Sequence, residues 1–390
     1  MAEEIRLPKF TKYQKFIVAI LAFLQFTIIL DFMILSPLSA ILIPELKISA
    51  SQFGLVVSSY AFSAGTSGFL AASFADKFDR KRMLLFFYTG FILGTFFCGI
   101  APNYELLLIA RIVTGLFGGV ISSISFAIVT DLFDYRMRGR VMGIVQTAFA
   151  SSQVLGLPIG LYLANLWNWH APFILVATVA SIVWVVVVFY MQPIDAHLKL
   201  QTDRRAFQHL IHTLSQPQYL KGFAATALLA TGGFMIMPFA SAFNVHNLGI
   251  LLSDLPYLYL VTGIVSMIGS PMIGILSDRL GAYKVFVMGS LLTVVLVSIY
   301  TRLSPITLPV LMAVSSIMFL GVSARIVSSS ALISMLPSAA DRGAYMSIGS
   351  SIQQVSGGVA AAFAGFLVLE TPDGSLMRFD WVGNAVAVST

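Results

Sequence analysis

The chain has 390 residues, of which 58% are hydrophobic and only 10% are charged, and its mean hydropathy is +0.89. Soluble domains carry about 25% charged residues, so this composition excludes a soluble protein and indicates a membrane protein. The formal net charge of +6 does not indicate a nucleic-acid-binding protein, because the basic residues are not gathered on one soluble face.

Apolar stretches long enough to cross a hydrocarbon core about 30 Å thick as helices recur along the whole chain. We predict eleven of them, at residues 16–43, 52–74, 83–101, 105–130, 141–166, 170–191, 219–243, 254–276, 283–303, 308–334 and 343–369. The connections are short except for the polar segment 192–218. We therefore expect a six-helix bundle in residues 1–191, a cytoplasmic linker in residues 192–218 and a second bundle in residues 219–390.

A polar loop follows the eleventh stretch and leads to WVGNAVAVST, the last ten residues. Such a segment is too short to span a bilayer. We expect it to be the start of a twelfth helix that is incomplete, so that the second bundle has five full helices and part of a sixth.

Lysine and arginine are concentrated on one side of the predicted helices. The N-terminal tail, the linker and alternate loops hold 18 of the 23. The positive-inside rule then places the N-terminus and the linker in the cytoplasm. No signal peptide is apparent, so we expect a multi-pass protein of the cell membrane, inner or plasma.

Two loops of the first half recur at equivalent places in the second half. ASFADKFDRKR (72–82) aligns with GILSDRLGAYK (274–284), and RGRVMGI (138–144) aligns with RGAYMSI (342–348). Internal duplication of this kind is common in transporters. The two halves are therefore predicted to be related six-helix units.

Three charged residues lie deep in the predicted helices, namely Asp31, Arg111 and Arg325. Burying each one costs at least about 2.5–3.5 kcal/mol. The two copies of ARIV that hold the arginines are 214 residues apart, whereas the loops are offset by 202 and 204, so the arginines lie at different depths. An ion pair that fixes helix packing is one interpretation of these charges, and a proton or substrate site is the other.

Three stretches of the sequence resemble motifs of the major facilitator superfamily. ASFADKFDRKR is similar to its loop signature, although Asp79 stands where a glycine is expected; ARIVTGLFGG (110–119) is similar to its fourth-span motif, and SSQVLGLPIG (151–160) to its antiporter motif. The matching positions are Asp76, Lys77 and Arg80 in the first loop, Gly274, Asp278, Arg279 and Gly281 in the second, Gly115 in the fourth span, and Gly156, Pro158 and Gly160 in the fifth.

The resemblance implies an all-α membrane protein with the major facilitator fold, in which two six-helix bundles are related by pseudo-two-fold symmetry. It is closest to the proton-coupled drug and metabolite efflux branch. It also implies that the loop motifs gate the transport path and that Asp31 and Arg111 face a central cavity. Burial would favour the neutral form of Asp31 and Arg111 its ionised form, so Asp31 could change protonation as water enters or leaves.

Further residues are candidates for lining the cavity, namely Thr27, Phe32, Gln146, Gln153, Gln353 and Gln354. Thr27 shares a helix face with Asp31, and Gln146 and Gln153 share a face with each other. Phe32 with the paired Gln353 and Gln354 suggests a path that also accepts apolar groups. One acid against two arginines favours a substrate with a carboxylate or phosphate group, which arginine pairs well.

The sequence thus predicts a secondary transporter that works by alternating access and exports small organic, anionic or amphipathic compounds with proton coupling. A proton-coupled uptake symporter is an alternative, and a non-transporting membrane sensor or scaffold is another. We find no catalytic constellation, cofactor motif or metal cluster, and the single cysteine, Cys98, allows no disulfide framework. The expected partners are a small-molecule substrate, protons and the lipid bilayer, with no nucleic acid, and the expected state is a monomer.

Overall fold

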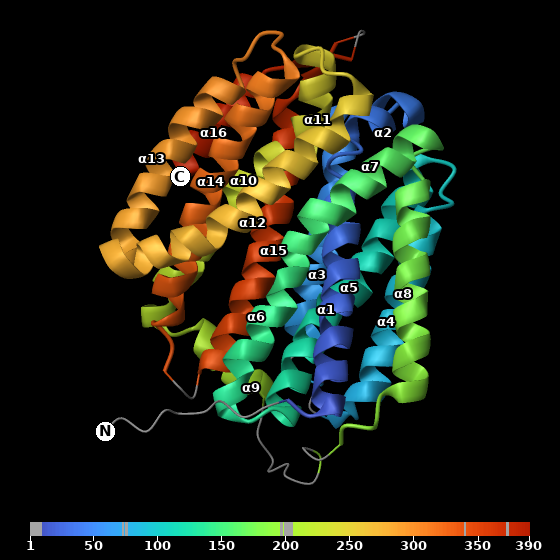
Figure 1. Ribbon diagram of the computed structural model, residues 1–390, viewed down its shortest axis with the longest axis vertical. Coiled ribbons are helices and arrows are strands. Elements are labelled where there is room, and N and C mark those ends of the chain that lie inside the picture. Colours follow the sequence, from blue (N-terminus) through green and yellow to red (C-terminus); the bar gives the residue numbers. More distant parts are fainter. Residues whose placement is uncertain are drawn as a thin grey trace.

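The computed structural model describes residues 10–71, 74, 77–195, 198, 206–338, 341–371 and 374–390. Nearly all of these residues are helical (Figure 1). The first half contains α1 (Lys12–Ile34), α2 (Ser39–Leu46), α3 (Ala50–Ala71), α4 (Arg80–Cys98), α5 (Tyr104–Leu132), α6 (Tyr135–Ser151), the π-helix η2 (Ser152–Gly156), α7 (Leu157–Leu166) and α8 (Ala171–Tyr190).

The second half follows α9 (Ala206–Leu214), a short helix within the segment predicted to be a linker. It contains α10 (Pro217–Ile236), η4 (Met237–Phe239), α11 (Ala240–Ala242), η5 (Phe243–Asn247), η6 (Leu252–Asp254), α12 (Leu255–Leu280), α13 (Ala282–Tyr300), α14 (Leu308–Ser334), α15 (Arg342–Leu367), the two-stranded antiparallel hairpin of β1 (Leu369–Glu370) and β2 (Leu376–Met377), and α16 (Phe379–Ser389).

Local sequence explains where the helices of the first half begin and end. A capping box formed by Thr11 and Gln14 starts α1, and the side chain of Asn103 caps α5. The first helix ends at Ile34, shortly before Pro37, which has no backbone N–H and cannot continue a helix. Between α12 and α13 the chain turns at Gly281, whose φ of 93° strongly favours glycine.

Ten helical segments in the described residues are long and apolar enough to cross a membrane. The eleventh predicted stretch, 343–369, is also a helix, the 26-residue α15, but its glutamines, serines and glycines make it less apolar than those ten. In Figure 1, α15 lies between helices of the two halves. One side of it packs on α3, whereas Val359, Phe363 and Phe366 remain exposed. The last helix, α16, has 11 residues.

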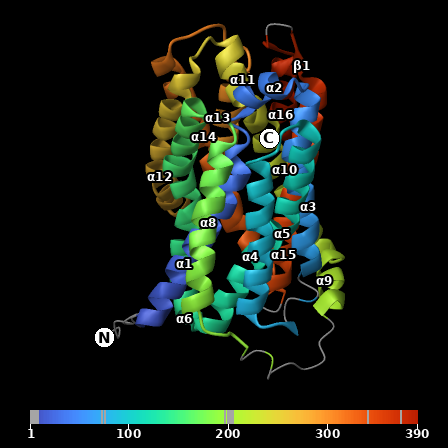
Figure 2. The same ribbon diagram turned by 90° about the vertical axis from the view of Figure 1, so that its right-hand side faces the viewer.

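The molecule has two distinct ends, which Figure 2 shows one above the other. We call them the α2 end, which carries α2 and α11, and the α9 end, where α1 starts. One apolar core runs through the first half and continues into the second half at the α2 end, where Phe53 of α3 contacts Phe239 of η4. At the α9 end a second, smaller cluster forms around Tyr219, Phe223 and Tyr345.

Glycines bring α3 and α15 into close contact along their length. A Cβ atom added to Gly65 would lie 2.9 Å from the carbonyl oxygen of Ser351, and one added to Gly54 would lie 2.9 Å from that of Ala361. Small residues of this kind allow helix backbones to approach closely within a membrane. The contact between α3 and α15 therefore joins the two halves directly.

This close contact predicts different effects of the same substitution at two helical glycines. Gly65→Ala is expected to lower the free energy of unfolding by about 1–3 kcal/mol through overpacking. Gly349→Ala, in α15, meets no atom within 4 Å and should be neutral or stabilising by up to about 1 kcal/mol, because alanine favours helix. Denaturant unfolding of the purified protein in detergent would measure both; equal effects would contradict the packing described.

Candidate functional site

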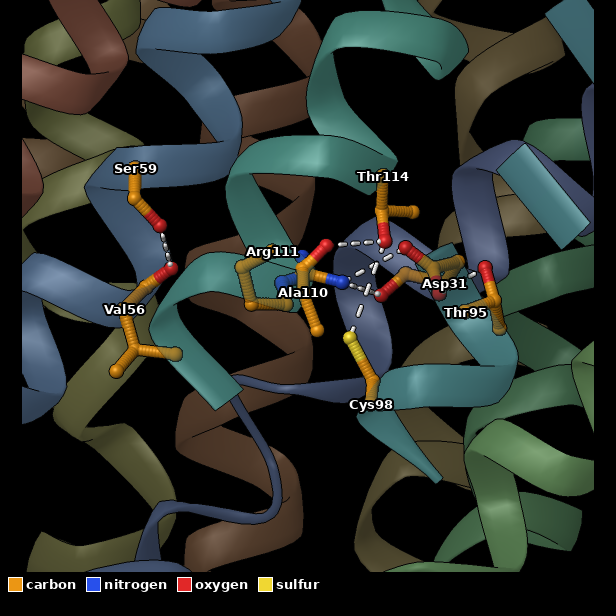
Figure 3. A network of polar contacts seen from close by, with 8 residues as sticks. All are labelled: Asp31, Val56, Ser59, Thr95, Cys98, Ala110, Arg111 and Thr114. Carbon is orange, nitrogen blue, oxygen red and sulfur yellow. Dashed lines mark hydrogen bonds and ion pairs between the residues drawn. The ribbon is translucent and has the colours of Figure 1, made fainter. Parts of the chain in front are cut away.

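Asp31 of α1 and Arg111 of α5 form an ion pair inside the first half (Figure 3). Arg111 Nη1 lies 2.7 Å from Asp31 Oδ2 and also donates to the backbone oxygen of Asp31 at 3.3 Å. The Thr95 hydroxyl of α4 donates to the other carboxylate oxygen, Oδ1, at 3.0 Å. Both charged residues are 0% exposed, so the structure brings these two predicted residues together but seals them from solvent.

The guanidinium of Arg111 is only partly satisfied. Its Nε and Nη2 atoms are buried and have no hydrogen-bond partner among the described residues. Its carbon Cζ lies 4.5 Å from the centre of the Tyr60 ring in α3, which gives a cation–π contact worth about 2 kcal/mol when desolvated. Because arginine donates from a rigid fork, Nε and Nη2 form a second donor edge beside the one that binds Asp31.

The fourth-span glycines make room for Tyr60. A Cβ atom at Gly115 would lie 2.5 Å from the backbone oxygen of Tyr60, and one at Gly118 would lie 2.8 Å from its hydroxyl. Arg111, Gly115 and Gly118 follow the i, i+4, i+7 spacing of one helix face. The motif therefore places the arginine on the same face as the two glycines that leave room for Tyr60, whose ring covers it.

The fifth-span motif packs against α1 on either side of Asp31. Gly156, at the end of η2, lies against the Leu30 side chain, and Gly160 of α7 lies against that of Ile34. The Ser152 hydroxyl donates to the backbone oxygen of Phe26 at 3.2 Å. Pro158 is buried in the first turn of α7, where a missing N–H is tolerated. These residues fix the segment of α1 that carries the carboxylate.

Arg325 lies apart from this pair, in α14 of the second half. It is 5% exposed, and its Nε has no hydrogen-bond partner in the residues that the structure describes. A Cβ atom at Gly232 of α10 would lie 3.5 Å from its Nη1. No carboxylate of the described ranges forms an ion pair with it. The structure therefore does not join Arg325 to Asp31 and Arg111.

A small polar pocket lies between α3, α5 and α15. Its lining includes Tyr60, Ser122, Ser123, Ser351 and Gln354, and its volume is about 50 Å³. One water molecule needs roughly 10–15 Å³ of such space, so the pocket can hold a few water molecules. Tyr60 is thus a common wall between this pocket and Arg111.

Of the residues expected to line a cavity, only Gln354 borders this pocket. Thr27 is fully buried, and its hydroxyl lies 3.0 Å from that of Tyr88, so it points into the first half instead. Phe32 contacts the rings of Tyr60 and Phe234. The exposed Gln146 and Gln353 and the half-buried Gln153 lie outside the pocket lining.

The first loop motif forms a network at the α9 end. Arg80 Nε donates to Asp131 Oδ2 of α5 at 2.9 Å. Asp79 caps α4 by accepting from the backbone N–H of Arg82 at 2.8 Å, and it also accepts from that of Ile194 at 2.7 Å. Lys77 is exposed, and Asp76 lies outside the described residues. The departure from glycine at position 79 therefore supplies an N-cap.

The second loop motif is exposed. Asp278 and Arg279 lie at the end of α12, and a Cβ atom at Gly274 would meet no atom within 4 Å. Gly281 forms the turn into α13. Within the described ranges, this copy thus forms no packed network like that of the first. In the described ranges there is also no group of three or more His, Cys, Asp or Glu residues that could hold a metal ion.

Sequence reasoning missed three residues of this arrangement, namely Tyr60, Thr95 and Asp131. A signal existed for Asp131, because it is an acid at the end of a predicted span next to a basic loop. Tyrosine and threonine are ordinary in apolar helices, so the other two gave no such signal.

Comparison with known proteins gives consistent matches. The Major Facilitator Superfamily model matches residues 21–221 and 222–382. The uncharacterized MFS-type transporter YceJ of Bacillus subtilis (strain 168) is 29% identical over 270 residues, covering 69% of this chain and 68% of YceJ. Multidrug resistance protein 3 of the same organism is 29% identical over 155 residues, covering 40% of this chain and 30% of that protein.

Solved structures match over most of the chain. A bacterial homolog of the human lysosomal transporter Spinster, in an inward-facing and unoccupied conformation, superposes with a TM-score of 0.74 at 15% identity, covering 92% of this chain and 83% of that one. The nucleoside transporter NupG superposes with a TM-score of 0.72 at 14% identity, covering 96% of each chain. At these identities the similarity concerns the fold.

The buried ion pair predicts a marked difference between single and double substitutions. Arg111→Met leaves the Asp31 carboxylate buried without its partner and is expected to reduce the free energy of unfolding by about 3–5 kcal/mol. The double variant Asp31→Asn/Arg111→Met removes both charges and should recover most of that loss. Unfolding of each variant in detergent tests this, and a double variant as unstable as the single one would show that charge burial is not the cause.

Proposed function

This chain belongs to the Major Facilitator Superfamily of membrane transporters, which are not enzymes, and we propose that it is a proton-coupled exporter of small organic compounds. The observation that carries the proposal is the sealed pair of Asp31 and Arg111. Placing a carboxylate within a membrane-spanning helix costs free energy, and carboxylates that are retained there typically mark functional sites. Proton binding is the function that the chemistry of a carboxylate suits.

The orientation follows from the basic residues of the loops. Arg80, Lys81 and Arg82 begin α4 at the α9 end, where α1 also starts. The positive-inside rule supports a cytoplasmic α9 end and a location in the cell membrane.

An inward-facing conformation is supported by where the two halves are bonded. At the α2 end, the backbone N–H of Ala242 donates to the buried Ser39 hydroxyl at 3.2 Å, and the Asn165 amide donates to the backbone oxygen of Leu252 at 2.9 Å. Both hydrogen bonds join the first half to the second at this end. The halves would separate more easily at the opposite, cytoplasmic end, where the pair of Arg80 and Asp131 would brace the first half as a gate moves.

Protonation of Asp31 would change the stability of this state. It would leave Arg111 as a buried cation whose Nε and Nη2 already lack hydrogen-bond partners among the described residues. An uncompensated buried charge is strongly destabilising, so the first half would have to rearrange or admit water. Release of the proton would restore the pair and the sealed state. Alternation between these two states is what proton-coupled transport requires.

Small organic compounds are the class of substrate that we propose. Support comes from the similarity of part of the chain to multidrug resistance protein 3 of Bacillus subtilis. The Nε and Nη2 donor edge of Arg111 has the geometry to bind a carboxylate or phosphate group, and Arg325 would add a second positive charge from the other half.

Uptake by proton symport is the second candidate, and the same edge of Arg111 favours it. An anion would bind Arg111 best when Asp31 is protonated, because the competing carboxylate is then neutral. Proton and anion would then bind together and cross in the same direction. A non-transporting sensor or scaffold gains no support from the site, since it would have no use for a buried proton-binding group.

The role of Asp31 can be tested by proton movement in proteoliposomes that contain pyranine as an internal pH indicator. Benzenesulfonate and tetraphenylphosphonium are suitable probes because both carry permanent charges and bring no proton of their own. A transported probe should change the internal pH in the wild type and in Glu45→Gln, which removes an exposed acid of α2. Asp31→Asn should lose the response while remaining folded. A normal response in Asp31→Asn would refute the proposal.

The sign of the pH change separates the two directions of coupling. With valinomycin and potassium holding the voltage at zero, entry of an added probe in exchange for an internal proton makes the interior more alkaline. Entry together with a proton makes it more acidic. We expect alkalinisation. Acidification with the anionic probe would establish symport instead.

A further inference from the structure

A series of ring contacts joins Arg111 to the second half. The guanidinium carbon lies 4.5 Å from the Tyr60 ring centre, the Tyr60 and Phe32 ring centres are 5.3 Å apart, and those of Phe32 and Phe234 are 5.5 Å apart. The four residues come from α5, α3, α1 and α10, so the series passes from the ion pair of the first half to a helix of the second.

The last ring in the series is fixed by its own half. A Cβ atom at Gly357 of α15 would lie 2.6 Å from the Phe234 ring, so the ring rests directly on the α15 backbone. Phe234 therefore follows α10 and α15 when the second half moves. Phe32 is the residue next to Asp31 in α1 and follows the first half.

Tyr60 separates the polar pocket from the charged pair. It borders the pocket together with Ser122 and Gln354, and only 1% of its surface is exposed. The Tyr60 ring also covers the guanidinium of Arg111, whose Nε and Nη2 lack hydrogen-bond partners among the described residues. Removing the ring from this position would let pocket water hydrogen-bond to those donors.

We propose that Tyr60 is a positioning residue that controls the access of water to Asp31 and Arg111 according to the position of the second half. While Phe234 supports Phe32, the Tyr60 ring stays on Arg111 and the pair is dry. When the second half moves, Phe32 loses that support, Tyr60 leaves Arg111 and water enters from the pocket. The link to proton transfer rests on the proposed function; the control of hydration does not.

The only cysteine of the sequence provides a direct test. Cys98 is fully buried beside the pair, and its Sγ lies 3.8 Å from the Thr114 hydroxyl (Figure 3). A thiol reacts as thiolate, which requires access of water. The rate at which N-ethylmaleimide labels Cys98 in proteoliposomes of the full chain therefore reports hydration of the site, without any measurement of protons or substrate.

Labelling of wild type is expected to be slow. Tyr60→Leu should accelerate it by about tenfold or more, because loss of a desolvated cation–π contact changes an opening equilibrium by at least that factor. Tyr60→Phe keeps the ring and should stay within about twofold of wild type. Unchanged labelling in Tyr60→Leu would overturn the proposal, and so would equal acceleration by Tyr60→Phe, since the ring would then not be the barrier.

A matched pair of substitutions tests the link to the second half. Phe234→Leu should accelerate labelling, whereas Phe53→Leu should not, although it also removes an aromatic contact between the halves, that of Phe53 with Phe239. Equal rates in the two variants would overturn the link. This comparison remains decisive if Tyr60→Leu does not fold. Normal proton transport by Asp31→Asn would refute the proposed function and leave these labelling results unaffected.

Discussion

A charge surrounded by hydrocarbon has to be neutralised by a group that the protein itself supplies, and much of the first half is arranged around this requirement. Asp31 receives hydrogen bonds from Arg111 and Thr95, which come from two different helices. Gly115 and Gly118 admit the Tyr60 ring that covers the arginine. The charged residues and the fourth-span glycines, which are separate motifs in the sequence, thus pack together around one ion pair.

The second half contacts the first half more extensively at the α2 end than at the α9 end. Apolar packing, a buried hydrogen bond and an exposed one connect the halves at the α2 end. At the α9 end the contact is smaller: a separate cluster around Tyr219, Phe223 and Tyr345 of the second half, with Phe69 of α3 packed against it. Such inequality is what a rocking mechanism needs, because one end can act as the pivot while the other opens. The helix α15 packs on α3 of the first half and contributes serines and Gln354 to the pocket.

The sequence permitted prediction of the fold and of the residues that carry charge, because both leave strong signals. Long apolar stretches define helices, and Asp31 and Arg111 stand out within them. The cavity-lining residues were harder to predict, since helix periodicity does not tell which face points to lipid, to a neighbour or to a cavity. Thr27 is the example: it shares a face with Asp31, yet its hydroxyl meets Tyr88. Tyr60 could not be identified, because only the folded structure places its ring on Arg111.

The location of both charges within one half has a consequence for biogenesis. The two residues are 80 positions apart in the chain. At a synthesis rate of about 5–20 residues per second, α1 waits roughly 4–16 seconds for the arginine that neutralises its aspartate. During this interval Asp31 has to remain protonated, stay near the interface or be shielded by the insertion machinery. Because the partner belongs to the same half, the wait ends before any helix of the second half has been made.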